Sequence, residues 1–154
     1  MKKNLFILTL VLISVFSFSA CSDDDSSTPE QYVEFTFDGT TYRGTGILSV
    51  EAYFSGDITF VGCQKSGYYF WFEIPGNTTG TFTKNSYTAA MTVEAPEGNY
   101  DAYHEDDLGT SFTITITQYD DYVKGTFSGT LEGGSTGEVV KNISGSFFVK
   151  LSDY

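Results

Sequence analysis

From residue 31 onward, apolar and polar residues alternate in short runs that are separated by turn-forming residues. A period of two residues is typical of strands that bury one face, and no segment after residue 21 has apolar residues at helical spacing. Turn signals such as Asp38-Gly39, Ser55-Gly56 and Ser66-Gly67 lie between the runs. The pattern predicts strands at residues 32–37, 41–44, 47–54, 57–63, 68–74, 80–83, 87–93, 111–119, 122–131 and 140–151.

About ten short strands with turns at close intervals predict an all-β domain over residues 31–154. We expect an antiparallel β-sandwich, and a closed or partly open β-barrel is the alternative. Phe and Tyr are abundant and there are 16 glycines, which agrees with pleated strands and tight turns.

The register of the C-terminal hairpin follows from the same alternation. If Asp120-Asp121 is a two-residue turn, Tyr119 faces Tyr122 and the strands pair outward from there. One face then carries Phe112, Ile114 and Ile116 opposite Gly129, Phe127 and Gly125. The other face carries Thr113, Thr115 and Thr117 opposite Ser128, Thr126 and Lys124. A slip of one residue would mix the two faces, so the pattern predicts this pairing.

A spaced motif occurs twice near the C-terminus. The run Val123-x-Gly125-x-Phe127-x-Gly129-x-Leu131 returns as Ile143-x-Gly145-x-Phe147-x-Val149-x-Leu151. Two copies are too few for a repeat protein, but both strands present alternate residues to one core.

The N-terminus predicts export from the cytosol. Lys2 and Lys3 precede an apolar stretch over residues 5–16 that is short for a bilayer span and typical of a signal segment, expected at residues 1–20. The sequence Phe18-Ser19-Ala20-Cys21 resembles a lipobox, the processing site of bacterial lipoproteins. The resemblance implies that Cys21 is lipidated and carries several fatty acyl chains, enough for a stable anchor. A plain secretory peptide is the alternative.

Residues 21–30 are expected to form a flexible acidic tether. The run Ser22-Asp23-Asp24-Asp25 is similar to the export signal of Bacteroidetes-type lipoproteins, which implies display on the outer face of the outer membrane. Residues 124–131 with 142–147 resemble uncharacterised lipoproteins of that type with a β-sandwich domain. The resemblance carries no catalytic or binding residues.

The net negative charge of the chain limits the kinds of partner that it can bind. The chain has 20 acidic and 8 basic residues, and loss of Lys2 and Lys3 with the signal segment leaves 6 against 20, a net charge of −14. Such a protein is a poor partner for nucleic acids and for anionic membrane surfaces, so we expect no nucleic-acid ligand.

No residue pattern predicts catalysis, and we expect a protein that is not an enzyme and has no cofactor. His104 is the only histidine and no Gly-x-Ser-x-Gly motif accompanies it, so it is expected in a solvated loop. Cys63 lies in a strand and is expected to be a small buried hydrophobe. Four glutamates alternate with apolar neighbours and are expected to face outward: Glu34, Glu51, Glu73 and Glu94.

Two segments are candidate ligand sites. The acidic residues Asp101, Glu105, Asp106 and Asp107 offer oxygens to calcium, although the charge pattern favours a loop that simply faces water. In the strand at residues 68–74, Tyr69 and Trp71 lie on the face opposite Phe70, Phe72 and Ile74. The usual burial of Trp and Tyr favours a second face that is covered by another strand or loop. The alternative is an exposed aromatic platform for sugar rings.

The leading hypothesis is a non-catalytic lipoprotein of the outer membrane or cell surface that binds a glycan or protein, or that belongs to an envelope assembly. Two alternatives remain open: a β-barrel that carries a small apolar ligand, and a hydrolase with acids near His104.

Overall fold

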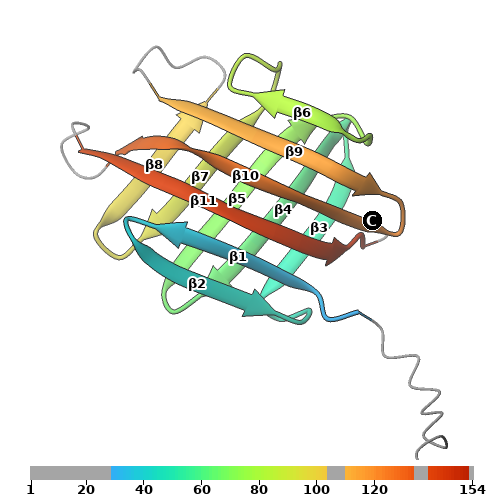
Figure 1. The fold of residues 1–154 in the computed structure, drawn as a ribbon, viewed down its shortest axis with the longest axis horizontal. Coiled ribbons are helices and arrows are strands. Elements are labelled where there is room, and N and C mark those ends of the chain that lie inside the picture. Colours follow the sequence, from blue (N-terminus) through green and yellow to red (C-terminus); the bar gives the residue numbers. More distant parts are fainter. Residues whose placement is uncertain (1–28, 104–109, 134–138, 153–154) are drawn as a thin grey trace, which may run out of the picture.

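The computed structural model describes residues 29–103, 110–133 and 139–152, which are almost entirely β-strand. Eleven strands occur in these ranges (Figure 1). They are β1 (Tyr32–Phe37), β2 (Thr40–Thr45), β3 (Val50–Ser55), β4 (Ile58–Lys65), β5 (Tyr68–Pro75), β6 (Gly80–Thr83), β7 (Ala90–Ala95), β8 (Gly98–Tyr103), β9 (Ser111–Tyr119), β10 (Tyr122–Gly133) and β11 (Val139–Lys150). The all-β prediction is confirmed. No helix long and apolar enough to cross a membrane is found in the ranges described.

The strands form two layers that pack face to face, as Figure 1 shows. The first layer has the order β2-β1-β11-β10-β9-β6, and the second has the order β8-β7-β5-β4-β3. Strand β10 joins them, because it continues past β9 and pairs through Glu132 and Gly133 with β8. On the opposite side, Ser152 bridges to Tyr53 of β3. The result is a nearly closed antiparallel sheet, which fits the predicted sandwich and its partly open barrel alternative.

Three of the hairpins close through two-residue turns whose residues both have positive φ. These pairs are Asp38 and Gly39 (φ 48° and 80°), Gly56 and Asp57 (59° and 67°), and Ser66 and Gly67 (54° and 84°). Positive φ at both positions defines the type I′ turn, whose twist matches that of the flanking strands and which favours Asp and Gly. These turns fix the registers of β1 with β2, of β3 with β4, and of β4 with β5.

The predicted pairing of β9 with β10 is correct along most of its length and wrong next to the turn. Phe112, Ile114 and Ile116 face Gly129, Phe127 and Gly125 as expected. Beyond Gly125 the register shifts by one residue, so Lys124 pairs with Gln118 rather than Thr117, and Tyr119 faces Val123 rather than Tyr122. The cause is a β-bulge at Thr117, whose hydroxyl donates to the carbonyl of Lys124 at 3.3 Å.

The twice-occurring motif has a packing explanation. Strands β10 and β11 are antiparallel, so Gly125 faces Phe147 and Phe127 faces Gly145. Each phenylalanine ring extends over the opposing glycine: the end of the Phe147 ring lies 2.7 Å from where a Cβ on Gly125 would be, and that of Phe127 lies 2.5 Å from the equivalent position on Gly145. Glycine is therefore needed at both positions to make room for a core ring.

Aromatic side chains fill the space between the layers. Phe127 of the first layer stacks on Phe70 of the second, with ring centroids 4.6 Å apart, and Phe147 lies 5.1 Å from Phe72. Phe35 extends the cluster with a centroid distance of 5.2 Å to Phe70. These five rings are almost completely buried, so contacts between aromatic rings from both layers contribute strongly to the stability of the fold.

Three segments depart from the predicted strands. Residues 87–89 were expected to begin a strand, but they form a turn and β7 begins at Ala90. Residues 98–103 were not predicted as a strand but form β8, in which Tyr100 and Ala102 point into the core while Asn99, Asp101 and Tyr103 point outward. Residues 47–49 were expected to begin a strand that reached residue 54, but β3 begins at Val50. Ile47 and Leu48 instead form an exposed turn between β2 and β3.

Candidate functional site

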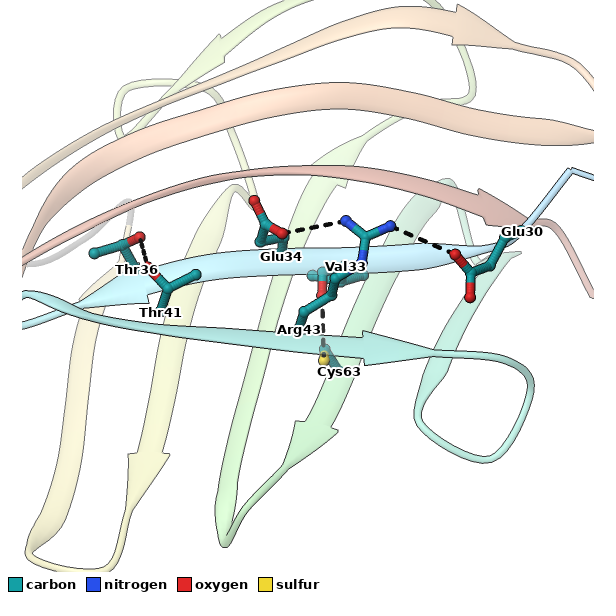
Figure 2. A network of polar contacts seen from close by, with 7 residues as sticks. All are labelled: Glu30, Val33, Glu34, Thr36, Thr41, Arg43 and Cys63. Carbon is teal, nitrogen blue, oxygen red and sulfur yellow. Dashed lines mark hydrogen bonds and ion pairs between the residues drawn. The ribbon is translucent and has the colours of Figure 1, made fainter.

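The two outer faces of the sandwich have different chemistry. On the first layer, one hydroxyl-bearing residue from each strand lies in a row across all six strands. The row consists of Thr83, Thr113, Ser128, Ser144, Thr36 and Thr41. Figure 2 shows its end, where the hydroxyls of Thr36 and Thr41 are 2.8 Å apart beside the ion pair of Arg43 with Glu34. Beside this row the face carries a few charges and the aromatic side chains of Tyr32, Phe148 and Tyr122.

The outer face of the second layer is aromatic and acidic, and Trp71 lies at its centre. Trp71 is on β5, the middle strand, between Gly62 of β4 and Thr92 of β7. Because both cross-strand neighbours are small, the indole has room to lie on the sheet surface. The type I′ turn at Ser66-Gly67 fixes this register, since it decides which residue of β4 faces Trp71.

Four rings form what we call the aromatic row: Tyr53, Phe60, Trp71 and Tyr103. Their centroids follow one another at 4.8, 6.0 and 6.5 Å. The rings of Tyr53 and Phe60 are stacked, with 14° between their planes, and Trp71 is inclined by 58° to Tyr103. Phe60 leans over Gly62, since an added Cβ there would lie 2.8 Å from its ring.

The aromatic row is partly open to solvent. Phe60 is only 8% exposed, whereas Tyr103 is 41% exposed and Trp71 is half-buried. All eleven strands belong to the two layers, which pack core to core, so no described strand covers this face. The expectation was a covering strand or loop: no strand covers the face in the part of the chain that the structure describes, and residues 104–109, which follow Tyr103, lie outside that part. On the same face, Tyr69 contacts Glu51, and Trp71 contacts the rings of Phe60 and Tyr103.

Carboxylates surround the aromatic row. Glu51, Glu73, Glu94 and Asp101 occupy outward positions of the second layer. Glu51 accepts a hydrogen bond from the Tyr69 hydroxyl at 2.9 Å, and burial together with this carboxylate raises the pKa of Tyr69. Burial also raises the pKa of Glu73. No Lys or Arg occupies an outward position of strands β3, β4, β5, β7 or β8, so this face is uniformly acidic.

The structure covers only part of the calcium candidate. Asp101 lies on β8 and faces Thr92 across the strands. Glu105, Asp106 and Asp107, like His104, lie outside the described residues. Within the described ranges, no three His, Cys, Asp or Glu side chains gather as a metal site would require.

Cys63 has the environment of a packing residue. Its thiol is 1% exposed and lies 3.9 Å from the carbonyl oxygen of Val33, as Figure 2 shows. Burial raises the pKa of Cys63 to about 11. Gly44 makes room for the sulfur, because a Cβ there would be 2.5 Å from it. A buried thiol that stays protonated at neutral pH is a poor nucleophile.

We therefore expect Cys63 of the folded mature protein to resist thiol reagents at pH 8. Dithionitrobenzoate should react with it only after the chain is unfolded in guanidinium, because both exposure and ionisation of the sulfur require unfolding. Absorbance at 412 nm before and after denaturation measures this. Rapid labelling of the native protein would contradict the buried position.

The aromatic row was only partly found from the sequence, which singled out Tyr69 and Trp71 but missed Tyr53, Phe60 and Tyr103. Two of these residues, Tyr53 and Phe60, could have been found by counting cross-strand pairs outward from a correctly placed two-residue turn, the method used for the C-terminal hairpin. Applied to Ser66-Gly67, it pairs Gly62 with Trp71. The predicted turn at Ser55-Gly56 would have paired Tyr53 with Ile58, whereas the observed turn at Gly56-Asp57 pairs it with Phe60. Tyr103 could not be found in this way, because its strand was not predicted.

Comparison with protein families, with curated proteins and with solved structures finds no match for this chain.

Proposed function

We propose that this chain is a non-catalytic lipoprotein of the bacterial outer membrane, displayed at the cell surface, whose second-layer outer face binds a glycan. The single observation that carries the binding proposal is the aromatic row, a partly open line of rings with Trp71 at its centre and carboxylates beside it. The proposed lipid anchor and the proposed cell-surface location rest on the lipobox-like sequence that ends at Cys21 and on the acidic run that follows it.

The chemistry of the row suits a sugar chain. The C–H faces of sugar rings pack on aromatic side chains, and their hydroxyl groups bond to carboxylates and amides. Here Trp71 and Tyr103 supply accessible ring surface, while Tyr53 and Phe60 stack on one another and support the indole. Gln64 and Glu94 are exposed beside Tyr69 and offer polar partners.

The length of the aromatic row and the negative charge of its face limit the class of glycan that can bind. The row crosses from β3 to β8, four strand spacings or about 19 Å, which is long enough for an oligosaccharide rather than a single ring. An acidic face with no basic side chain at an outward position of its strands repels polyanions. We therefore propose a neutral or amino-bearing glycan as the ligand.

The two alternative functions have less support. A carrier of a small apolar ligand needs an internal cavity, whereas Phe35, Phe70, Phe72, Phe127 and Phe147 fill the space between the layers. For a hydrolase, the residues offered by the sequence are His104 and acids that lie outside the described residues.

The Trp71→Ala variant tests the binding proposal. We expect its affinity for neutral polysaccharides to fall at least about tenfold, since a central aromatic contact is a typical hot spot. Loss of the indole should lower the free energy of unfolding by only about 1 kcal/mol, because Trp71 is half-buried and packs on two neighbouring rings. Affinity electrophoresis and calorimetry with soluble glucan, mannan and xylan, and alginate as the polyanion, would measure the change.

The matched control is Tyr122→Ala. Tyr122 lies on the outer face of the first layer and stacks on Phe148, with centroids 4.7 Å apart, so the variant also removes one ring of a half-buried pair. It should bind as the unmodified protein does. Retained binding in Trp71→Ala, or equal losses in both variants, would contradict a site at the aromatic row.

A further inference from the structure

The most exposed aliphatic side chains described lie at one point, the tip of the turn between β2 and β3. Ile47 is 81% exposed and Leu48 is 93% exposed. The turn is well defined: Gly46 has φ of 72°, and its carbonyl accepts hydrogen bonds from the amides of Ser49 and Val50 at 3.0 and 3.1 Å. Ile47 lines two surface hollows of about 210 and 320 Å³.

This turn lies where the chain enters the fold. The amide of Gly46 donates to the carbonyl of Gln31 at 3.3 Å, and the side-chain oxygen of Gln31 accepts from the amide of Lys150 at 2.9 Å. Figure 1 likewise shows the start of β1 and the end of β2 at the same corner. The exposed pair is thus held beside the segment that leads back to Cys21.

The length of that segment brings the turn close to any membrane that holds Cys21. Seven residues, 22–28, separate Cys21 from Pro29, so the polypeptide can span at most about 30 Å between the lipidated residue and the fold. A group tethered at such a distance meets the bilayer at an effective concentration in about the millimolar range. Weak apolar contacts are then sufficient for docking.

We infer that Ile47 and Leu48 insert into the interfacial region of the bilayer that anchors the protein. The inference rests on the lipid anchor proposed above, because without it two aliphatic side chains would bind too weakly. The occupant is a lipid surface rather than a protein, since the tether ends beside this turn and keeps it near the bilayer. Zwitterionic lipid is the suitable surface for a domain that is strongly acidic overall.

Insertion would also orient the binding face. The hollow beside Leu48 is lined by Glu51 and Tyr69, which belong to the outer face of the second layer. A docked turn therefore holds the aromatic row in one orientation above the membrane instead of letting the domain rotate on its tether.

Electron paramagnetic resonance on the full lipidated protein in phosphatidylcholine vesicles tests this inference. A nitroxide on Thr45→Cys, an exposed site two residues before Ile47, leaves the apolar pair intact, and buried Cys63 should not compete for the label. We expect the label to be severalfold more accessible to oxygen, relative to a water-soluble nickel chelate, than in the same labelled chain with Ile47→Ser and Leu48→Ser. A label on Asn77→Cys, beyond the opposite end of β5, should be water-accessible in both chains.

The possible outcomes distinguish a failure of membrane docking by Ile47 and Leu48 from a failure of the proposed lipid anchor. If the protein floats with the vesicles but the Thr45→Cys label is as water-accessible as the Asn77→Cys label, docking is overturned and the anchor stands. The same conclusion follows if the two serine substitutions leave the Thr45→Cys label unchanged. If the protein does not float with the vesicles, the anchor and the docking inference both fail, while glycan binding at the aromatic row is unaffected.

Discussion

Gly145→Ala is expected to lower the free energy of unfolding by about 3 kcal/mol or more, a large share of the roughly 5–15 kcal/mol typical of a domain. The added methyl group would collide with the backbone carbonyl of Glu34 and lie 2.5 Å from the tip of the Phe127 ring. The ring can turn aside, but the carbonyl cannot move without breaking the pairing of β1 with β11. Thermal and guanidinium unfolding would show the loss, with a melting temperature lower by about 10 °C.

Two further variants identify the cause of that loss. Ser144→Ala changes the neighbouring outward residue of the same strand and should alter stability by less than about 0.5 kcal/mol. Adding Phe127→Leu to Gly145→Ala removes the ring tip but leaves the collision with Glu34, so stability should not return. A single Gly145→Ala variant as stable as the unmodified protein would mean that β1 and β11 do not approach as closely as described.

Alternation in the sequence determines which face of a strand is buried, and this part of the fold was predictable. The hairpins that close at Asp38-Gly39 and Ser66-Gly67, and the buried phenylalanines of β10 and β11, follow from residue spacing and turn chemistry alone. Alternation does not say which strands become neighbours. The pairing of β10 with β8, which joins the layers, links residues about 30 positions apart and leaves no signal in either strand.

The errors in the predicted strands and in their pairing have local physical causes. The bulge at Thr117 escaped prediction because Thr117 and Gln118 are both polar, so either one satisfies the alternation opposite Lys124. Asp120 favours the observed turn, since its side chain accepts hydrogen bonds from the amide of Tyr122 at 2.8 Å and from Gln118 at 2.9 Å. Strand β8 was missed because only Tyr100 and Ala102 are apolar and inward-facing there.

The candidate site, like the fold, was predictable within a strand but not between strands. Spacing within one strand was sufficient to put Tyr69 and Trp71 on a common face away from the core. The aromatic row, however, is a property of several strands, because it needs Gly62 beside Trp71 and a strand that ends in Tyr103. Its open face likewise follows from how the two layers pack, which the sequence pattern did not specify.

Phe127→Ala is expected to lower the free energy of unfolding by about 3–5 kcal/mol, the usual range for loss of a buried phenylalanine. Phe127 comes from the first layer and packs on Phe70 and Phe72 of the second, with ring centroids at 4.6 and 6.0 Å. Its removal therefore opens a cavity at the contact between the layers. Guanidinium unfolding followed by near-ultraviolet circular dichroism, which reports on aromatic packing, would measure the loss.

The cavity provides an independent test. Its walls would be the rings of Phe70, Phe72 and Phe147, and an apolar cavity of this kind stays dry and binds benzene. Benzene should therefore raise the melting temperature of Phe127→Ala and leave that of the exposed control Thr126→Ala unchanged, because a ligand that binds only the folded state stabilises it. If Phe127→Ala is as stable as Thr126→Ala and does not respond to benzene, the two layers do not meet through this ring.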